Sequence, residues 1–196
     1  KIVRRDDFES SRPFEREFEG IQRYEPVSRT HAGLVQVLHV GEDRDAGYFY
    51  YVMELAENAD PGSVLYRPRT LRGDLQARGG LPVEECIEIG ITLASALGHL
   101  HRAGLVHRDV KPANIIFVDG MAKLADVGLV ARLSDSRSLV GTEGYFAPEG
   151  TGKPRSDVYS LGKVLYECIT GLERTTFPDV PADWGGGPES RPAFEF

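Results

Sequence analysis

The feature that most constrains the fold is a short segment, 115–124, which has the pattern of a tight β-hairpin. Two mainly apolar runs, 115–118 and 121–124, flank the dipeptide Asp119-Gly120. This dipeptide suits a two-residue type I′ turn, because both residues can adopt a positive φ. A hairpin returns its second strand to the edge where the first began. Residues just before and just after the segment are therefore expected to be neighbours in space.

Four polar side chains occupy these two ends of the hairpin, namely Asp109, Lys111, Asn114 and Asp126. Asn114 and Asp126 offer the oxygen ligands that Mg²⁺ prefers, and such sites usually leave room for substrate phosphates. Lys111 could neutralise charge on a phosphoryl group in transfer, and Asp109 would be free to accept a proton from an attacking hydroxyl. Any one of them alone would more commonly form a turn or a cap. Four with this spacing around one hairpin favour hard-cation and phosphate chemistry.

The composition narrows the class of protein. The 196 residues are 41% apolar and 27% charged, as expected of a soluble globular protein of one or two domains. A net charge of −7 argues against a general nucleic-acid binder, because phosphate neutralisation requires clustered Lys and Arg. Cys86 and Cys168 are too few for a disulfide scaffold and are interpreted as small buried residues in a reducing compartment. No apolar stretch approaches the roughly 20 residues of a membrane span, and no signal-peptide core is found.

The first part of the chain is expected to contain one helix and two strands. The helix begins near Ser11 and ends at Pro26, where its apolar periodicity stops. Residues 35–40 and 47–53 follow as strands, the second rich in Tyr and Phe. Residues 57–72 contain Asn, Asp, Pro and Gly and are predicted to connect two subregions.

Two more helices are predicted in the rest of the chain. One begins at Leu81-Pro82 and is capped by Gly104, and the other spans Ser156 to about Thr170, before Gly171. Their core-facing stripes are predicted to be Ile87, Ile91, Ala94, Leu97 and Leu100 in the first and Leu161, Val164, Leu165 and Cys168 in the second. Early strands followed mainly by helices indicate an α+β arrangement.

Five short segments occur in a characteristic order along the chain. They read HRDVKPAN at 107–114, DVG at 126–128, GT at 141–142, APE at 147–149 and DVYSLG at 157–162. In order and spacing they resemble bacterial-like members of the eukaryotic-type protein kinase family. The matching parts are the catalytic loop, the metal-binding motif with Val in place of Phe, the end of the activation segment and the central helix of the large lobe.

The resemblance implies a role for each polar residue around the hairpin. Asp109 would be the base that orients the substrate hydroxyl, and Lys111 would contact the γ-phosphate of ATP, as in Ser/Thr-directed kinases. Asn114 and Asp126 would hold the Mg²⁺ ions, and Asp126 would thereby also contribute to the nucleotide site. Thr142 would pack near Asp109 and help to form the surface that accepts the substrate peptide.

The resemblance also implies an ion pair in the small lobe. Glu17 would be the carboxylate of the small-lobe helix, because Phe18, Ile21 and Tyr24 follow it at the family's spacing. Its expected partner is Lys1, in the strand that precedes the helix. As the terminal residue of the sequence, Lys1 is equally consistent with a solvated charge.

The segment from Met53 to Ala56 falls where the family links its two lobes. Backbone groups of Glu54 and Ala56 would bind the adenine edge of ATP, with Met53 at the back of the pocket. Ile116 would pack against the face of the adenine. For Met53 and Ile116 the alternative is ordinary core packing, which any fold would provide.

The implied fold is the α+β, two-lobe fold of protein kinases. Residues 1–56 would form a partial small lobe, of strands plus one helix, and the hinge, while 57–196 would form a mainly helical large lobe. The family's glycine-rich loop and C-terminal helices have no counterpart in the sequence, so we expect a fragment of the domain that alone binds nucleotide weakly. Glu149 would then lack its Arg partner. Val127 would hold the active arrangement less firmly than the family's Phe, although metal binding should survive.

Arg108 next to the candidate base implies control by phosphorylation of the activation segment, because a phosphate can pair with Arg and order a loop. Ser134, Ser136 and Ser138 are the candidate sites, with polar loop residues as the alternative reading. His107 is expected to be a packed structural residue, as in the family.

These observations predict an ATP- and Mg²⁺-dependent serine/threonine protein kinase that acts on protein substrates in the cytoplasm. The first alternative is a kinase-like binding or scaffold module without activity. The presence of every polar catalytic-loop residue and of the metal-binding Asp argues against it. A kinase of small molecules is a further alternative, which segment 141–149 disfavours because it matches peptide-substrate kinases.

Overall fold

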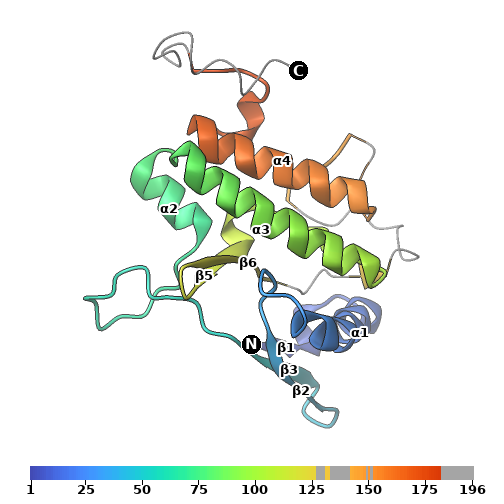
Figure 1. Cartoon of the computed structure of the whole chain (residues 1–196). Helices are drawn as coiled ribbons and strands as arrows, with labels where there is room; N and C mark the ends of the chain where they lie inside the picture. The colour runs from blue at the N-terminus through green and yellow to red at the C-terminus, as the bar shows by residue number, and fades with distance from the viewer. Residues whose placement is uncertain (127–130, 133–141, 149, 151, 182–196) are drawn as a thin grey trace.

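The computed structural model describes residues 1–126, 131–132, 142–148, 150 and 152–181 of the chain. A three-stranded sheet with a long helix beside it lies at one end of the molecule (Figure 1). Two long helices lie side by side at the other end, and a β-hairpin lies between these two parts.

The sheet is antiparallel and has the strand order β1-β3-β2. Its strands are β1 (Ile2–Arg4), β2 (Val37–Asp43) and β3 (Tyr48–Met53). The prediction for β3 is confirmed to within a residue, whereas β2 begins two residues later than predicted and continues to Asp43. The reason is that Val35 bonds elsewhere, since its N–H donates to the Leu124 carbonyl of the hairpin at 2.9 Å.

Helix α1 (Ser11–Ser28) covers the sheet through aromatic contacts. The rings of Phe14 and Phe18 lie 5.2 and 5.1 Å from the ring of Phe49. The prediction that the helix ends at Pro26 is wrong by two residues. Proline removes one backbone hydrogen bond, but the last turn is held by contacts of its own: the Ser28 hydroxyl donates to the Glu25 carbonyl at 2.7 Å and accepts from the Val37 N–H.

The two long helices are α3 (Val83–Arg102) and α4 (Pro154–Thr170), close to their predicted limits. They approach closely where α3 carries Gly90, since a Cβ there would lie 3.2 Å from Leu165. Gly171 caps α4 with φ 69, and Gly104 follows α3 with φ 75, as predicted.

The predicted stripe of α3 is only partly right. Leu97 and Leu100 are buried, but Ile87 and Ile91 are 54% and 67% exposed, and Ala94 is exposed too. The buried face also includes Cys86, Ile89, Leu93 and Ala96. Helix α3 is apolar on two faces, and only packing against α4 and the hairpin selects between them.

An unpredicted helix, α2 (Leu71–Arg78), follows the long loop after β3, and its first two residues fall within the predicted connection 57–72. The Thr70 hydroxyl caps it by accepting from the Gly73 N–H at 3.1 Å, and Gly79 ends it with φ 77. Eight residues offer too few turns for an apolar period to show, so only these caps mark it in the sequence.

The predicted hairpin is confirmed, as β5 (Ile115–Val118) and β6 (Met121–Leu124). Val118 pairs with Met121, and the intervening Asp119 and Gly120 have φ 50 and 77, as a type I′ turn requires. Two-residue strands β4 (Leu105–Val106) and β7 (Ala131–Arg132) form a separate antiparallel pair. Short 3₁₀ helices occur at Arg5–Asp7, Pro112–Asn114 and Arg174–Thr176.

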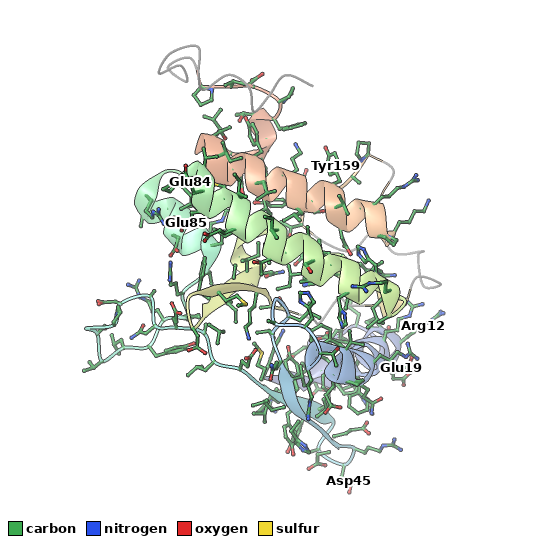
Figure 2. The ribbon with its side chains drawn as sticks, viewed as in Figure 1. Arg12, Glu19, Asp45, Glu84, Glu85 and Tyr159 are labelled. Carbon is green, nitrogen blue, oxygen red and sulfur yellow. The ribbon has the colours of Figure 1, made fainter. Side chains whose placement is uncertain are left out.

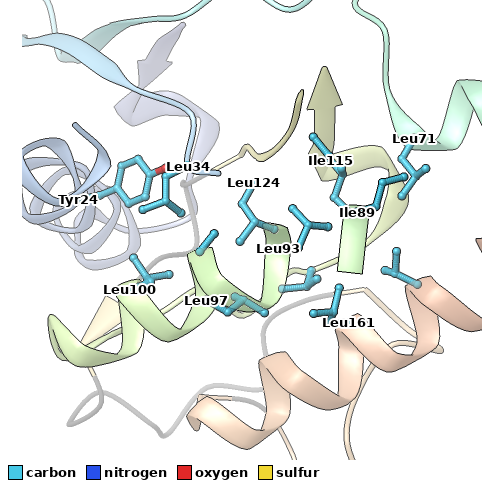
Figure 3. Packing of buried hydrophobic residues seen from close by; sticks show 14 of the residues in the cluster. Tyr24, Leu34, Leu71, Ile89, Leu93, Leu97, Leu100, Ile115, Leu124 and Leu161 are labelled. Carbon is cyan, nitrogen blue, oxygen red and sulfur yellow. The ribbon is translucent and has the colours of Figure 1, made fainter. Parts of the chain in front are cut away.

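One hydrophobic core runs through both parts of the molecule (Figure 3). It extends from Tyr24 and Leu34 through Leu124 of the hairpin to Leu97 on α3 and Leu161 on α4. The core therefore fixes the hairpin relative to both the sheet and the long helices. Within the described residues, the helices all fall short of the length and apolar character that crossing a membrane would require.

Candidate active site

The loop after β4 is anchored by a buried carboxylate of α4. Asp157, in the first turn of that helix, accepts hydrogen bonds from the backbone N–H groups of His107 (2.9 Å) and Arg108 (2.8 Å). The His101 ring contacts the same carboxylate at 2.7 Å. Arg108 has φ 72, which non-glycine residues rarely adopt, so these bonds hold a strained backbone in place. The sequence pattern predicts the helix that carries Asp157 but not this anchoring role.

The Asp109 carboxylate lies at the centre of a hydrogen-bonded group and is largely buried. One oxygen accepts from Lys111 Nζ at 2.6 Å and Asn114 Nδ2 at 2.8 Å, and the other accepts from the Thr142 hydroxyl at 2.7 Å. Lys111 also bonds Thr142. Burial would raise the pKa of Asp109, but the hydrogen bonds from Lys111 and Thr142 outweigh it and keep that pKa below its ordinary value. The carboxylate is therefore ionised and oriented at neutral pH.

The hairpin brings Asp126 to the same region, as its geometry predicts. The Ala125 N–H donates to the Asn114 carbonyl at 2.8 Å, and the Ala125 carbonyl contacts the buried His107 ring at 3.1 Å. Asp126 itself has φ 54, a second strained residue of this site, and forms an ion pair of 3.0 Å with Lys1. The burial and contacts of His107 are those of a packed structural residue.

The expected pairing of Lys1 with Glu17 is not formed. Lys1 binds Asp126 instead, and no ion pair joins it to Glu17 in the part of the chain that the structure describes. Burial raises the pKa of Glu17, the charge of Lys1 opposes this, and the charge of Asp126 adds to it. Glu17 is thus near both charges, but Asp126 is the carboxylate that Lys1 reaches.

A cavity of about 540 Å³ lies between the sheet and the hairpin. Most of the predicted nucleotide-binding residues line it: Lys1, Met53, Glu54, Ala56, Ile116 and Asp126. Asn114 lines it as well, whereas Glu17, Asp109 and Lys111 do not. Ile116, Ala56 and Ala125 pack together with Val35 in a small apolar cluster, so one wall of the cavity is apolar.

The segment after β3 presents its backbone to this cavity. The Glu54 side chain is held by the buried Lys123 of β6, at 2.7 and 2.9 Å, and accepts from the Gln36 N–H. The Ala56 carbonyl accepts from the Tyr66 hydroxyl at 3.2 Å. Among the described residues, no hydrogen bond uses the Glu54 carbonyl or the Ala56 N–H. One acceptor and one donor remain for a ligand.

The oxygen atoms at the hairpin ends fit a magnesium site by their chemistry. Asn114 donates to Asp109 through Nδ2, so its Oδ1 atom is the end left for another partner. Asp126 is half-exposed and bonds Lys1 through one of its two carboxylate oxygens. Both residues line the same cavity, and neutral and anionic oxygens are the ligands that Mg²⁺ takes alongside substrate phosphates.

The segment 142–148, which carries Thr142, is fixed by a second buried group. The Tyr145 hydroxyl donates to the buried Glu167 carboxylate and accepts from Arg72 at 3.0 Å. Burial, followed by the hydrogen bond to Glu167, raises the pKa of Tyr145. The Ser160 hydroxyl donates to the Tyr145 carbonyl at 2.8 Å. No motif in the sequence links these residues, because they come from three separate segments: α2, segment 142–148 and α4.

Several predicted features lie outside the described residues. These are Val127 and Gly128 of the metal-binding motif, the serines Ser134, Ser136 and Ser138, Gly141 and Glu149.

The fold and the site together define a class of protein. A sheet with one helix, a mainly helical second part and a cavity between them form the two-lobe α+β fold of protein kinases. The protein kinase domain family matches residues 1–180, and the chain belongs to that family.

The similar proteins are bacterial. A probable serine/threonine-protein kinase of Clostridium perfringens is 35% identical over 180 residues, which cover 87% of this chain and 24% of that protein. Serine/threonine-protein kinase PknL of Mycobacterium tuberculosis is 40% identical over 148 residues, which cover 70% of this chain and 34% of that protein. Serine/threonine-protein kinase PrkC of Bacillus subtilis is 34% identical over 185 residues, which cover 87% of this chain and 26% of that protein. The chain thus spans between a quarter and a third of the length of these relatives.

Proposed function

We propose that the chain carries the catalytic centre of a serine/threonine protein kinase, which transfers the γ-phosphate of ATP to Ser or Thr hydroxyls of protein substrates. The observation that carries the proposal is the Asp109 carboxylate, bound by Lys111, Asn114 and Thr142 beside a cavity of about 540 Å³. In this proposal residues 1–56 are a partial small lobe with the hinge, and 57–196 belong to the large lobe. The location is cytoplasmic, where ATP is available.

Asp109 acts as the acceptor for the substrate hydroxyl. Its low pKa makes it a weak base, so it contributes mainly by orienting the hydroxyl. It takes the hydroxyl proton as the new oxygen–phosphorus bond forms and the bond between the γ-phosphorus and the leaving ADP breaks. Thr142 and Asn114 restrict the carboxylate to one orientation, which contributes to the rate through positioning. Lys111 places a positive charge 2.6 Å from that carboxylate, where it can stabilise the transferred phosphoryl group.

Asn114 and Asp126 are the residues that would hold magnesium. When bound, the ion supplies positive charge that neutralises the phosphate oxygens of ATP. Lys1, paired with Asp126 at the edge of the cavity, provides a second positive charge for the phosphates. Glu17, although unpaired with Lys1, lies near enough to modulate this charge.

The adenine base is held on the opposite side of the cavity. The Glu54 carbonyl accepts from the 6-amino group and the Ala56 N–H donates to N1, a match to the one acceptor and one donor left at the hinge. Met53 closes the back of the pocket, and Ile116 packs against the base. The proposal also includes regulation by phosphorylation of Ser134, Ser136 or Ser138, in which the phosphate pairs with Arg108.

The test is phosphate transfer from labelled ATP to a generic protein substrate by the whole protein. Asp109→Asn should lower kcat by about two to four orders of magnitude, because it removes the proton acceptor. Asp45→Asn, at the exposed tip of the β2–β3 turn (Figure 2), is the matched control and should retain full activity. ATP binding with no transfer by the wild-type protein would favour the scaffold alternative instead.

A further inference from the structure

The loop between the hinge and α2 reaches back to the nucleotide cavity. Tyr66 and Pro68 line that cavity together with the hinge residues, although they follow Ala56 by at least ten positions. The Tyr66 hydroxyl donates to the Ala56 carbonyl at 3.2 Å, while its side chain remains about half-exposed. A side chain of this loop therefore occupies a hydrogen-bonding group of the hinge.

The position of Tyr66 is held by the loop itself. The two arms of the loop pair through Ala59 N–H to the Arg67 carbonyl and Arg69 N–H to the Glu57 carbonyl, both at 2.7 Å. The Asn58 side chain also accepts from the Arg67 N–H at 3.0 Å. In Figure 1 these arms form the extended loop that projects from the molecule between β3 and α2. Paired arms next to Tyr66 pre-organise its contact with the hinge.

The base of the arms is fixed to the large lobe. The Arg69 guanidinium bonds both Glu57 (3.0 Å) and Asp74 (2.8 Å) and stacks 4.2 Å from the ring of Phe117. Opposite charges and an aromatic face thus hold the last residue of the returning arm in one place. The tip, by contrast, is in solvent, since Val64 is 100% exposed.

The consequence concerns which purine fits the hinge. Adenine offers a donor at its 6-amino group and an acceptor at N1, which the Glu54 carbonyl and the Ala56 N–H satisfy. The Ala56 carbonyl is the next hinge group, and it is the acceptor that a substituent on purine C2 would reach. Tyr66 already uses that acceptor.

We propose that Tyr66 is a specificity-determining residue of the nucleotide site, which disfavours purines that carry an amino group at C2. The proposal rests on the ATP site described under Proposed function. A carbonyl oxygen has two lone pairs, so the discrimination is a few-fold rather than absolute. An adenine base, which has only hydrogen at C2, is unaffected.

The experiment compares ATP with its 2-amino analogue, 2,6-diaminopurine riboside triphosphate, by calorimetric titration of the whole protein in the presence of Mg²⁺. Tyr66→Phe keeps the ring and frees the Ala56 carbonyl. The ratio of the analogue's Kd to that of ATP should fall about three- to five-fold in this variant, the effect of one partly exposed hydrogen bond. The Kd of ATP should stay within about two-fold.

Two controls and a second Tyr66 variant separate a change in nucleotide specificity from a change in loop stability. Tyr159→Phe, on α4 (Figure 2) and not among the residues that line the cavity, should leave both affinities unchanged. GTP should bind poorly to the wild type and to Tyr66→Phe alike, because its O6 acceptor meets the Glu54 carbonyl. Tyr66→Leu removes the hydroxyl while keeping apolar bulk, and should move the ratio in the same direction as Tyr66→Phe.

The outcomes are distinguishable. ATP binding with an unchanged ratio in both Tyr66 variants would overturn the role of Tyr66 and leave the proposed function standing. A parallel weakening of ATP and analogue would also overturn it, since it would show that the hydroxyl only stabilises the loop. Failure of the wild-type protein to bind either nucleotide would overturn the proposed ATP site itself, and the specificity proposal with it.

Discussion

The two walls of the cavity use different parts of the chain. On the catalytic-loop wall, which meets the cavity through Asn114, the arrangement depends on side chains. Asp109, set back from the cavity, is bound by three other side chains, and Asp157 supports the loop from α4. On the hinge wall, the chain presents backbone groups to the cavity, and the Glu54 side chain is turned to Lys123. The first wall therefore depends on residue identity, whereas the second depends on the path of the chain. Substitutions should expose this difference.

The largest effect is expected at Asp157. Asp157→Ala removes the carboxylate that accepts from the buried His107 N–H and the partly buried Arg108 N–H, so the free energy of unfolding should fall by about 3 kcal/mol. Activity should be lost as well, because Asp109 directly follows the strained Arg108, whose backbone loses its support. Denaturant unfolding and phosphate transfer measure the two effects.

Asp157→Asn gives a graded comparison, because it retains one acceptor oxygen. Its free energy of unfolding and its activity should fall between those of wild type and Asp157→Ala. Asp45→Ala, in the exposed turn of Figure 2, is the matched control and should change neither quantity. A stable but inactive Asp157→Ala protein would contradict the view that stability and activity share this anchor.

An intermediate effect is expected at Lys123 on the hinge wall. Lys123→Met leaves the Glu54 carboxylate without its cation, and the free energy of unfolding should fall by about 2 kcal/mol. The affinity for ATP should stay within about two-fold, because in the proposed site the adenine base binds backbone groups. Denaturant unfolding and nucleotide titration test both statements.

The double variant Lys123→Met, Glu54→Gln should recover much of the lost stability, because it removes the uncompensated charge. A loss of ATP affinity as large as the loss of stability would show that the hinge, too, depends on side-chain identity. The distinction between the two walls would then fail.

The smallest expected effect is on how the free energy of unfolding depends on pH, and its sign differs between Asp109 and Glu17. The pKa of Glu17 is raised by burial, so its ionisation costs stability at neutral pH and the cost disappears as pH falls through the folded-state pKa. Glu17→Gln should therefore gain stability relative to wild type on going from pH 4.5 to 7. The pKa of Asp109 is lowered, so its stabilisation is complete above about pH 4.

Unfolding curves at several pH values check this prediction. Between pH 4.5 and 7 the difference in free energy of unfolding between wild type and Asp109→Asn should stay constant. The corresponding difference between wild type and Glu17→Gln should change with pH. The opposite pattern would mean that Glu17, not Asp109, is the carboxylate held by hydrogen bonds.

Predictions from the sequence succeeded where the interactions are local. The Asp119-Gly120 turn sets the hairpin register, and the spacing of Asp109, Lys111 and Asn114 places their side chains in contact. They failed where distant contacts decide. Lys1 pairs with Asp126 instead of Glu17, and α1 continues past Pro26 because the last turn bonds β2.

The stripe of α3 shows the same limit. Ile87 and Ile91 are as apolar and as regularly spaced as the residues that α3 buries, and periodicity alone could not rank the two faces. No sequence pattern predicted the contact of Tyr66 with Ala56, because that contact depends on how a long loop folds back.

By itself, the sequence determined the turn, the catalytic-loop spacing and the family, because these depend on residues close together along the chain. The tertiary structure alone decided which carboxylate Lys1 binds, that Asp157 supports the catalytic loop and that Tyr66 reaches the hinge. Those contacts join segments whose approach is driven by burial of the shared core, and burial is a property of the whole chain rather than of any short stretch.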